Sequence, residues 1–169
     1  MTADERKDLK KFRKILKSIM RKLKFLPEFT EKISKEEKRH TNCYAYAFKM
    51  LLKEDDERIF GFLGFTTGKY EPIVDSEYAI QLFKADAQGM GYRVEKSDAN
   101  MPKIGFKIAL FLCNDGDFHF MRMDNDGTWS AKDGYDGEIE KIEKDGQFLN
   151  PEQVDYGNEW NFLGIYLLW

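Results

Sequence analysis

The chain has 169 residues, of which 42% are hydrophobic and 15% aromatic, so it is long and apolar enough to fold as one domain around a substantial core. Its two cysteines do not form the dense framework of a small disulfide-rich secreted protein, and no run of about 18 apolar residues could span a membrane. Residues 1–40 hold 14 Lys and Arg against 7 Asp and Glu, whereas the remainder holds 13 against 23. A basic segment therefore precedes an acidic body, and in the absence of a secretory signal we expect a cytoplasmic protein with reduced thiols.

The first predicted element is an amphipathic helix over residues 5–26, which Pro27 ends. Seven apolar residues at three- and four-residue spacings form a stripe, and ten basic side chains lie between Arg6 and Lys24. We therefore divide the chain into a basic helix (1–27) and an α+β domain (28–169). The stripe packs on the acidic body or binds a protein partner or an anionic membrane surface. Nucleic acid is disfavoured as a partner because the helix lacks interleaved aromatic residues that stack on bases.

The segment from Tyr44 to Leu52 is apolar almost all the way round, which predicts a buried helix. Asn42 is a good N-cap because its side-chain oxygen can accept the free amide hydrogens of the first turn, and this places Cys43 at the first helical position. There the helix dipole is expected to lower the pKa of the thiol from about 8.5 toward neutrality, as a cysteine nucleophile requires. The alternative is an inert core thiol, because free cysteine usually packs as a small hydrophobe.

The remaining elements predict an α+β fold, with helices first and an antiparallel sheet after them. A helix is expected over residues 76–88, with Ser76 as its cap and Gly89-Met90-Gly91 as its stop. The expected strands begin at residues 92–95 and continue with residues 107–113, 118–123, 128–132 and 160–169. The sequence Asp124-Asn125-Asp126-Gly127 is similar to a calcium loop, but loop position twelve is Tyr135 and not a bidentate Glu, so we interpret it as a hairpin turn. We expect neither a metal site nor a cofactor.

His119 is the candidate partner of Cys43. Alternation along residues 118–123 puts His119 on one face of its strand, and a tight turn at 125–127 brings it opposite residues 132–134, where Asp133 offers an orienting carboxylate. A thiol at a helix N-terminus, a histidine and an acid are the side chains of a thiol hydrolase. His40, in a charged linker, is a weaker candidate because such a histidine is usually exposed.

Two of these assignments keep alternatives. A slip of one residue in the hairpin register would flip the face of the strand, so Asp124 and Ser130 are alternates for the role of Asp133. Asn42, Trp129 and Ser130 are candidates for contacting the oxyanion or the substrate.

The segments Asn42-Cys43-Tyr44-Ala45-Tyr46-Ala47 and Asp117-Phe118-His119-Phe120 together resemble the papain-like thiol hydrolases in the broad sense, nearest to the compact NlpC/P60 and CHAP amidases. The resemblance covers about residues 40–135. It implies a papain-like fold and a cysteine-dependent peptidase or amidase in which Cys43 is the nucleophile, His119 the base, and a peptide or other amide the substrate. Glu37 stands where papains carry a glutamine, and the Asp-Cys-Ser-Gly start of NlpC/P60 proteins is absent. The alternative function is a non-catalytic interaction protein that binds a partner through its surface or its basic helix.

Overall fold

The computed structural model describes residues 34–50, 61–68 and 72–169. The amphipathic helix predicted over residues 5–26 lies outside these ranges, as do residues 51 and 52 of the predicted core helix. The described helices are α2 (Lys35–His40), α3 (Cys43–Ala47) and α5 (Ser76–Gly89), with the 3-10 helices η1 (Phe65–Thr67) and η2 (Pro151–Gln153). The strands are β1 (Val94–Ser97), β2 (Phe106–Cys113), β3 (Phe118–Met123), β4 (Trp129–Lys132), β5 (Ile139–Lys141), β6 (Glu143–Lys144), β7 (Gln147–Phe148) and β8 (Trp160–Leu168). The fold class is α+β, as the sequence predicts.

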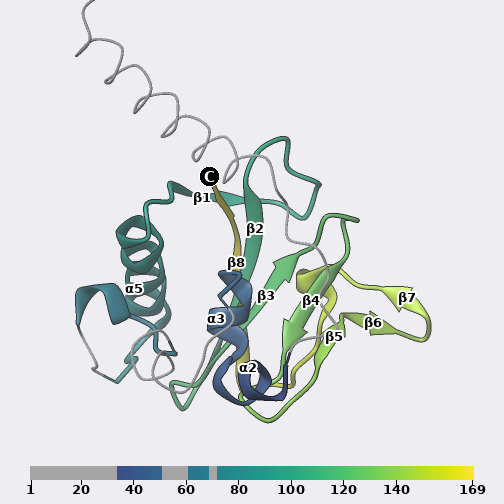
Figure 1. Ribbon diagram of the computed structural model, residues 1–169, viewed down its shortest axis with the longest axis horizontal. Helices are drawn as coiled ribbons and strands as arrows, with labels where there is room; N and C mark the ends of the chain where they lie inside the picture. Colours follow the sequence, from purple (N-terminus) through teal and green to yellow (C-terminus); the bar gives the residue numbers. More distant parts are fainter. Residues whose placement is uncertain (1–33, 51–60, 69–71) are drawn as a thin grey trace, which may run out of the picture.

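The strands β1 to β5 and β8 form one six-stranded antiparallel sheet in the order β1-β8-β2-β3-β4-β5 (Figure 1). The last strand of the chain, β8, therefore lies between β1 and β2, so the apolar strand β2 is in the interior of the sheet. All eight residues of β2 are buried, because it has neighbours on both sides and is covered on both faces. The short strands β6 and β7 form a separate hairpin.

Each face of the sheet carries its own core. On one face, α3 and α5 pack against alternate residues of β2, β3 and β8 (Figure 1). That core is rich in aromatic rings, such as Tyr44, Phe83 and Phe120. On the other face, residues of the segment 142–160 pack against a second apolar cluster that includes Met121 and Trp129. The candidate site, described below, is built where this second layer meets the N-terminal end of α3.

The core helix predicted to continue to Leu52 ends at Ala47. Lys49 adopts a left-handed conformation with φ 62°, which a helix cannot continue through. The N–H of Lys49 donates to the carbonyl of Tyr46, and that of Met50 to the carbonyl of Ala45, so the orphan carbonyls of the last turn are paired in a Schellman motif. Glycine is the usual residue at this left-handed position. Here the Lys49 ammonium lies 3.9 Å from the centre of the Phe106 ring, and this cation–π contact stabilises the lysine.

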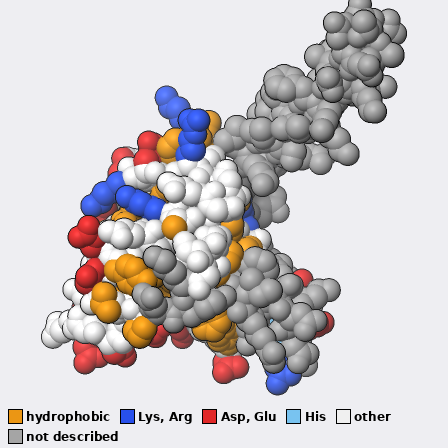
Figure 2. Space-filling model, turned by 90° about the vertical axis from the view of Figure 1, so that its left-hand side faces the viewer, with side chains coloured by type: hydrophobic (Ala, Val, Ile, Leu, Met, Phe, Trp, Pro, Cys, Tyr) orange, Lys and Arg blue, Asp and Glu red, His pale blue; other side chains and the backbone are white. Residues whose placement is uncertain are grey.

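The helix predicted over residues 76–88 is α5, with one correction at its start. Its N-cap is Asp75 and not Ser76, because the Asp75 carboxylate accepts a hydrogen bond from the Tyr78 N–H at 2.7 Å. The predicted stop is correct, since Gly91 has φ 87° and ends the helix. Within the described residues, no helix is long and apolar enough to cross a membrane. On the face shown in Figure 2, acidic side chains follow the left-hand and lower edges, while basic ones lie mainly toward the top.

Candidate active site

Asn42 and Cys43 begin α3 as the sequence predicts. The Asn42 side-chain oxygen accepts a hydrogen bond from the Ala45 N–H at 3.0 Å, so Asn42 is the N-cap and Cys43 the first helical residue. The Asn42 side-chain amide donates to the Gly61 carbonyl at 2.7 Å and lies 3.5 Å from the Tyr135 hydroxyl. The Asn42 side chain therefore connects the start of α3 to two other segments of the site. Its N–H donors are used in these contacts.

The thiol of Cys43 lies at an open edge of β3. The β3–β4 ladder begins at the pair Met121 and Ala131, so residues 118–120 pair with β2 on one side only. The N-terminal end of α3 approaches this gap, where the Cys43 thiol contacts the Phe118 carbonyl with an Sγ–O distance of 3.7 Å. The separation of β3 from β4 thus lets a residue of the helical layer reach the other face of the sheet.

His119 and Asp133 lie two residues beyond the last paired residues of the β3–β4 hairpin, Met121 and Ala131. The Asp133 carboxylate is near enough to raise the pKa of the His119 imidazole. Both side chains lie on the face that also carries Met121 and Ala131, since side chains two residues apart share a face. Cys43, His119 and Asp133 all line one cavity of about 940 Å³. The structure therefore brings together the three residues that the sequence singles out.

The expectation that the helix dipole lowers the pKa of the Cys43 thiol is wrong. The pKa of Cys43 is raised to about 12, chiefly by burial and to a smaller extent by the carboxylates of Asp117 and Asp133, and backbone hydrogen bonds at Phe120 and Tyr44 only partly oppose these effects. The side chain is 4% exposed, and a helix of five residues sums few peptide dipoles. Desolvation of the thiolate thus exceeds the dipole effect, and the resting thiol is neutral.

His119 is also a neutral group at physiological pH. Burial lowers the pKa of its imidazole, while Asp133 and Asp117 partly offset that effect. Its ring packs edge to face against Tyr156, with 5.2 Å between the ring centres, and against Trp160 at 6.4 Å. A neutral imidazole can accept a proton, so the cavity pairs an unionised thiol with an available base.

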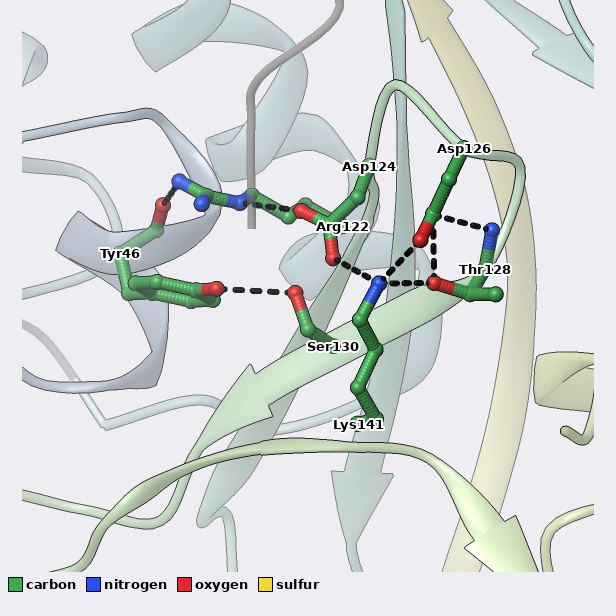
Figure 3. A network of polar contacts seen from close by, with 7 residues as sticks. All are labelled: Tyr46, Arg122, Asp124, Asp126, Thr128, Ser130 and Lys141. Carbon is green, nitrogen blue, oxygen red and sulfur yellow. Dashed lines mark hydrogen bonds and ion pairs between the residues drawn. The ribbon is translucent and has the colours of Figure 1, made fainter. Parts of the chain in front are cut away.

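Several residues singled out from the sequence lie away from the cavity lining. Trp129 is 1% exposed within the second core, and Ser130 is fully buried with its hydroxyl 2.8 Å from that of Tyr46. Asp124 is fully buried and forms ion pairs with Arg122 and Lys141 (Figure 3). Trp129 is therefore a core residue, and Ser130 and Asp124 belong to a buried polar network. None of the three makes the contact with substrate or imidazole that we expected.

Figure 3 also shows how this network holds the far end of α3. The Arg122 guanidinium donates to the Tyr46 carbonyl and to the Asp124 carboxylate, each at 3.2 Å, and stacks 3.9 Å from the centre of the Tyr46 ring. Lys141 lies 2.7 Å from the Asp126 carboxylate and also contacts the Thr128 hydroxyl. The β3–β4 turn and β5 are thereby tied to the helix that carries Cys43.

A second polar cluster, centred on Asp86 of α5, supports the other side of the site. Its buried carboxylate accepts hydrogen bonds from the Tyr44 hydroxyl, from the Gly64 N–H, and from both the N–H and the hydroxyl of Thr66, at 2.5 to 2.8 Å. These bonds fix the loop 61–68 against α3. Gly61 and Phe62 of this loop line the cavity.

The sequence did not point to several residues of the cavity wall. Tyr135, Glu138, Glu140, Tyr156 and Trp160 all line it. Tyr156 and Trp160 could have been noticed in the sequence, because these two aromatic residues flank a Gly-Asn turn at the start of the last strand. Glu138 and Glu140 offered none, because two acids in a charged stretch are typical of a solvated face. In the part of the chain that the structure describes, no group of His, Cys, Asp or Glu is arranged to hold a metal ion.

A family model described as a domain of unknown function, DUF7689, matches residues 32–161, which is more than half of the chain. The chain belongs to this family. No curated protein and no solved structure gives a significant match. Within the DUF7689 span lie Cys43, His119 and Asp133, together with the segment 142–160 that forms the cavity wall.

Proposed function

We propose that this DUF7689 domain is a cysteine-dependent hydrolase that cleaves a peptide or other amide bond, on a fold of the papain-like kind. The single observation that carries the proposal is the convergence of Cys43, His119 and Asp133, from three separate segments, on one cavity. A core thiol requires only apolar neighbours, whereas this thiol lies beside a cavity large enough for a substrate, with a neutral histidine in the same wall.

The neutral state of both groups determines the order of proton transfer. Because the pKa of Cys43 is raised and that of His119 is lowered, no thiolate–imidazolium pair stands ready. His119 therefore accepts the thiol proton as Sγ attacks the carbonyl carbon, and it then donates that proton to the departing amine. Water attacks the resulting thioester with His119 as base, which releases the acid product and restores the thiol. Asp133 orients the imidazole and stabilises its protonated form, and the Cys43 N–H binds the oxyanion.

The proposal is tested with a peptide library made from a whole-cell protein digest, in which mass spectrometry detects new termini. Cys43→Ala and His119→Ala are expected to abolish the new termini while keeping the circular dichroism spectrum. Cys113→Ser is the matched control, because Cys113 is the other buried thiol and lies outside the cavity lining. New termini produced equally well by Cys43→Ala would refute the proposal.

One observation favours the alternative of a non-catalytic binding domain. The Cys43 side chain is only 4% exposed and its thiol is neutral, as for a cysteine that serves packing alone. In that case the cavity would bind a ligand without reacting with it. Cys43→Ala would then keep full binding, and native Cys43 would resist every thiol reagent.

A further inference from the structure

We infer that Tyr156 is a further catalytic residue of this site, and that its hydroxyl donates a hydrogen bond to the oxyanion formed when Cys43 attacks a carbonyl group. The inference rests on the proposed function and adds a residue that the sequence did not single out. It follows from the place of Tyr156 in the cavity wall, from the contacts that hold its ring, and from a hydroxyl that the described residues leave without a hydrogen bond.

The proposed reaction needs an oxyanion donor beyond the backbone of α3. A tetrahedral intermediate carries its negative charge on oxygen, and preorganised N–H or O–H donors stabilise that charge. The Cys43 N–H is one such donor, and the nearest side chain with further N–H groups is that of Asn42. The Asn42 amide already donates to the Gly61 carbonyl at 2.7 Å and lies 3.5 Å from the Tyr135 hydroxyl. A second donor is therefore expected from another part of the cavity wall.

Tyr156 lines the cavity beside His119, and aromatic contacts hold its ring there. The ring packs edge to face against His119 and against Phe111, with 5.2 Å between the ring centres in each case, and the centre of the Trp160 ring lies 5.7 Å away. Phe111 belongs to the second core, so Tyr156 reaches the site from the face of the sheet opposite to α3. A side chain packed among several rings is positioned before substrate binds, as an oxyanion donor requires.

The backbone that follows Tyr156 is tied to the turn between β2 and β3. The Asn114 N–H of that turn donates to the Glu159 carbonyl at 2.9 Å, and the Asn161 side-chain amide donates to the Asn114 side-chain oxygen at 3.0 Å. Strand β3, which carries His119, begins directly after this turn. The position of Tyr156 relative to His119 is thus fixed by backbone contacts as well as by ring packing.

The Tyr156 hydroxyl is available to a substrate. The side chain is 38% exposed, and among the described residues its hydroxyl forms no hydrogen bond. The pKa of Tyr156 is raised, chiefly by burial and to a smaller extent by the charges of Asp133 and Cys43, so the hydroxyl is near enough to both groups to sense them. It stays protonated at neutral pH. A neutral phenol can donate a hydrogen bond to an anion without losing its own proton.

The hydroxyl acts in both halves of the proposed reaction. As Sγ of Cys43 bonds to the carbonyl carbon, the thiol proton passes to His119 and an electron pair of the C=O bond moves onto oxygen, where the Tyr156 O–H and the Cys43 N–H bind it. The pair returns to re-form the C=O bond of the thioester as the amine leaves with the proton from His119. Water attack on the thioester then creates a second oxyanion in the same place. Tyr156 keeps its proton throughout.

Two reagents that modify the same thiol test the inference on the full chain in a Cys113→Ser background. p-Nitrophenyl acetate acylates Cys43 through an oxyanion and releases p-nitrophenolate, whereas iodoacetamide alkylates it by displacing iodide from a saturated carbon. We expect Tyr156→Phe, which removes only the hydroxyl, to lower the acylation rate at least about tenfold and to leave the alkylation rate within about twofold. Reaction of the ester with other nucleophiles is subtracted with Cys43→Ala. Tyr92→Phe is the matched control and should change neither rate, because the Tyr92 ring also packs edge to face, on Phe106, but lies outside the cavity lining.

The ratio of the two rates decides the outcome. Unchanged rates in Tyr156→Phe, or an equal loss in both, would overturn the inference and leave the proposed hydrolase in place, since the dependence of alkylation on His119 tests that proposal separately. A parent protein that is alkylated but not acylated would also overturn the inference, because such a site stabilises no oxyanion. If neither reagent modified Cys43, the proposed hydrolase would fail, and the role of Tyr156 would fail with it.

Discussion

Replacing Asp86 with asparagine is expected to lower the free energy of unfolding by about 3 to 6 kcal/mol. The buried carboxylate accepts four hydrogen bonds, from the hydroxyl of Tyr44, the N–H of Gly64, and the N–H and hydroxyl of Thr66. An asparagine keeps one acceptor oxygen and turns an NH₂ group toward the other donors, so at least two of the four bonds are lost. Hydrogen bonds to a charged group contribute about 1.5 to 3 kcal/mol each, which gives the stated range.

The assay is urea denaturation at pH 7, followed by circular dichroism. Glu77→Gln is the matched control, since it makes the same chemical change on an exposed position of the same helix and should alter stability by less than about 0.5 kcal/mol. A double-mutant cycle with Tyr44→Phe should show coupling, because Tyr44 and Asp86 share a hydrogen bond of 2.5 Å. A loss below about 1 kcal/mol for Asp86→Asn would show that the carboxylate does not hold the loop as described.

Two further predictions concern the network that ties α3 to the sheet. Arg122→Met should lower the free energy of unfolding, measured by urea denaturation, by about 3 to 5 kcal/mol, because it leaves the buried Asp124 carboxylate without its guanidinium partner. Adding Asp124→Leu should recover much of that loss. No recovery would contradict the assignment of this ion pair. Burial raises the pKa of Tyr46 to about 12, so its contribution to stability is present below pH 10, the ordinary tyrosine value, and is lost as the pH rises through about 12. Tyr46→Phe should remove this alkaline component from a plot of stability against pH, and an unchanged plot would argue against it.

Local signals predicted the elements that carry the two reactive side chains. Asn42 before an apolar run specifies a helix start, and the turn at residues 124–127 fixes the register of β3 and β4, which ends two residues from His119 and Asp133. Both signals depend on neighbours in the sequence, through hydrogen bonds of a cap and of a tight turn. Strand β3 accordingly begins and ends where alternation of its residues predicts.

What the sequence did not predict depends on contacts between distant segments. The sign of the pKa shift at Cys43 is set by burial beneath other elements, which no local pattern reports. In the sequence, Asp86 is an ordinary polar residue of an amphipathic helix, and its role depends on hydrogen bonds from the distant loop 61–68. The strands β5 to β7 are only two or three residues long, so they carry no alternation long enough to detect.

The most direct test of the proposed chemistry is the rate at which iodoacetamide alkylates Cys43, mapped by mass spectrometry across pH 4 to 9 in Cys113→Ser and in Cys113→Ser/His119→Ala. A thiol with a pKa of about 12 ionises too rarely at neutral pH to react well unaided, so His119 must take its proton. At pH 7 we expect the protein with His119 to react at least about a hundredfold faster than the variant without it. Its rate should fall as the pH drops through the lowered pKa of His119, because the protonated imidazole is no longer a base. Equal rates in the two proteins, or no alkylation of Cys43 in either, would contradict a catalytic pair of Cys43 and His119.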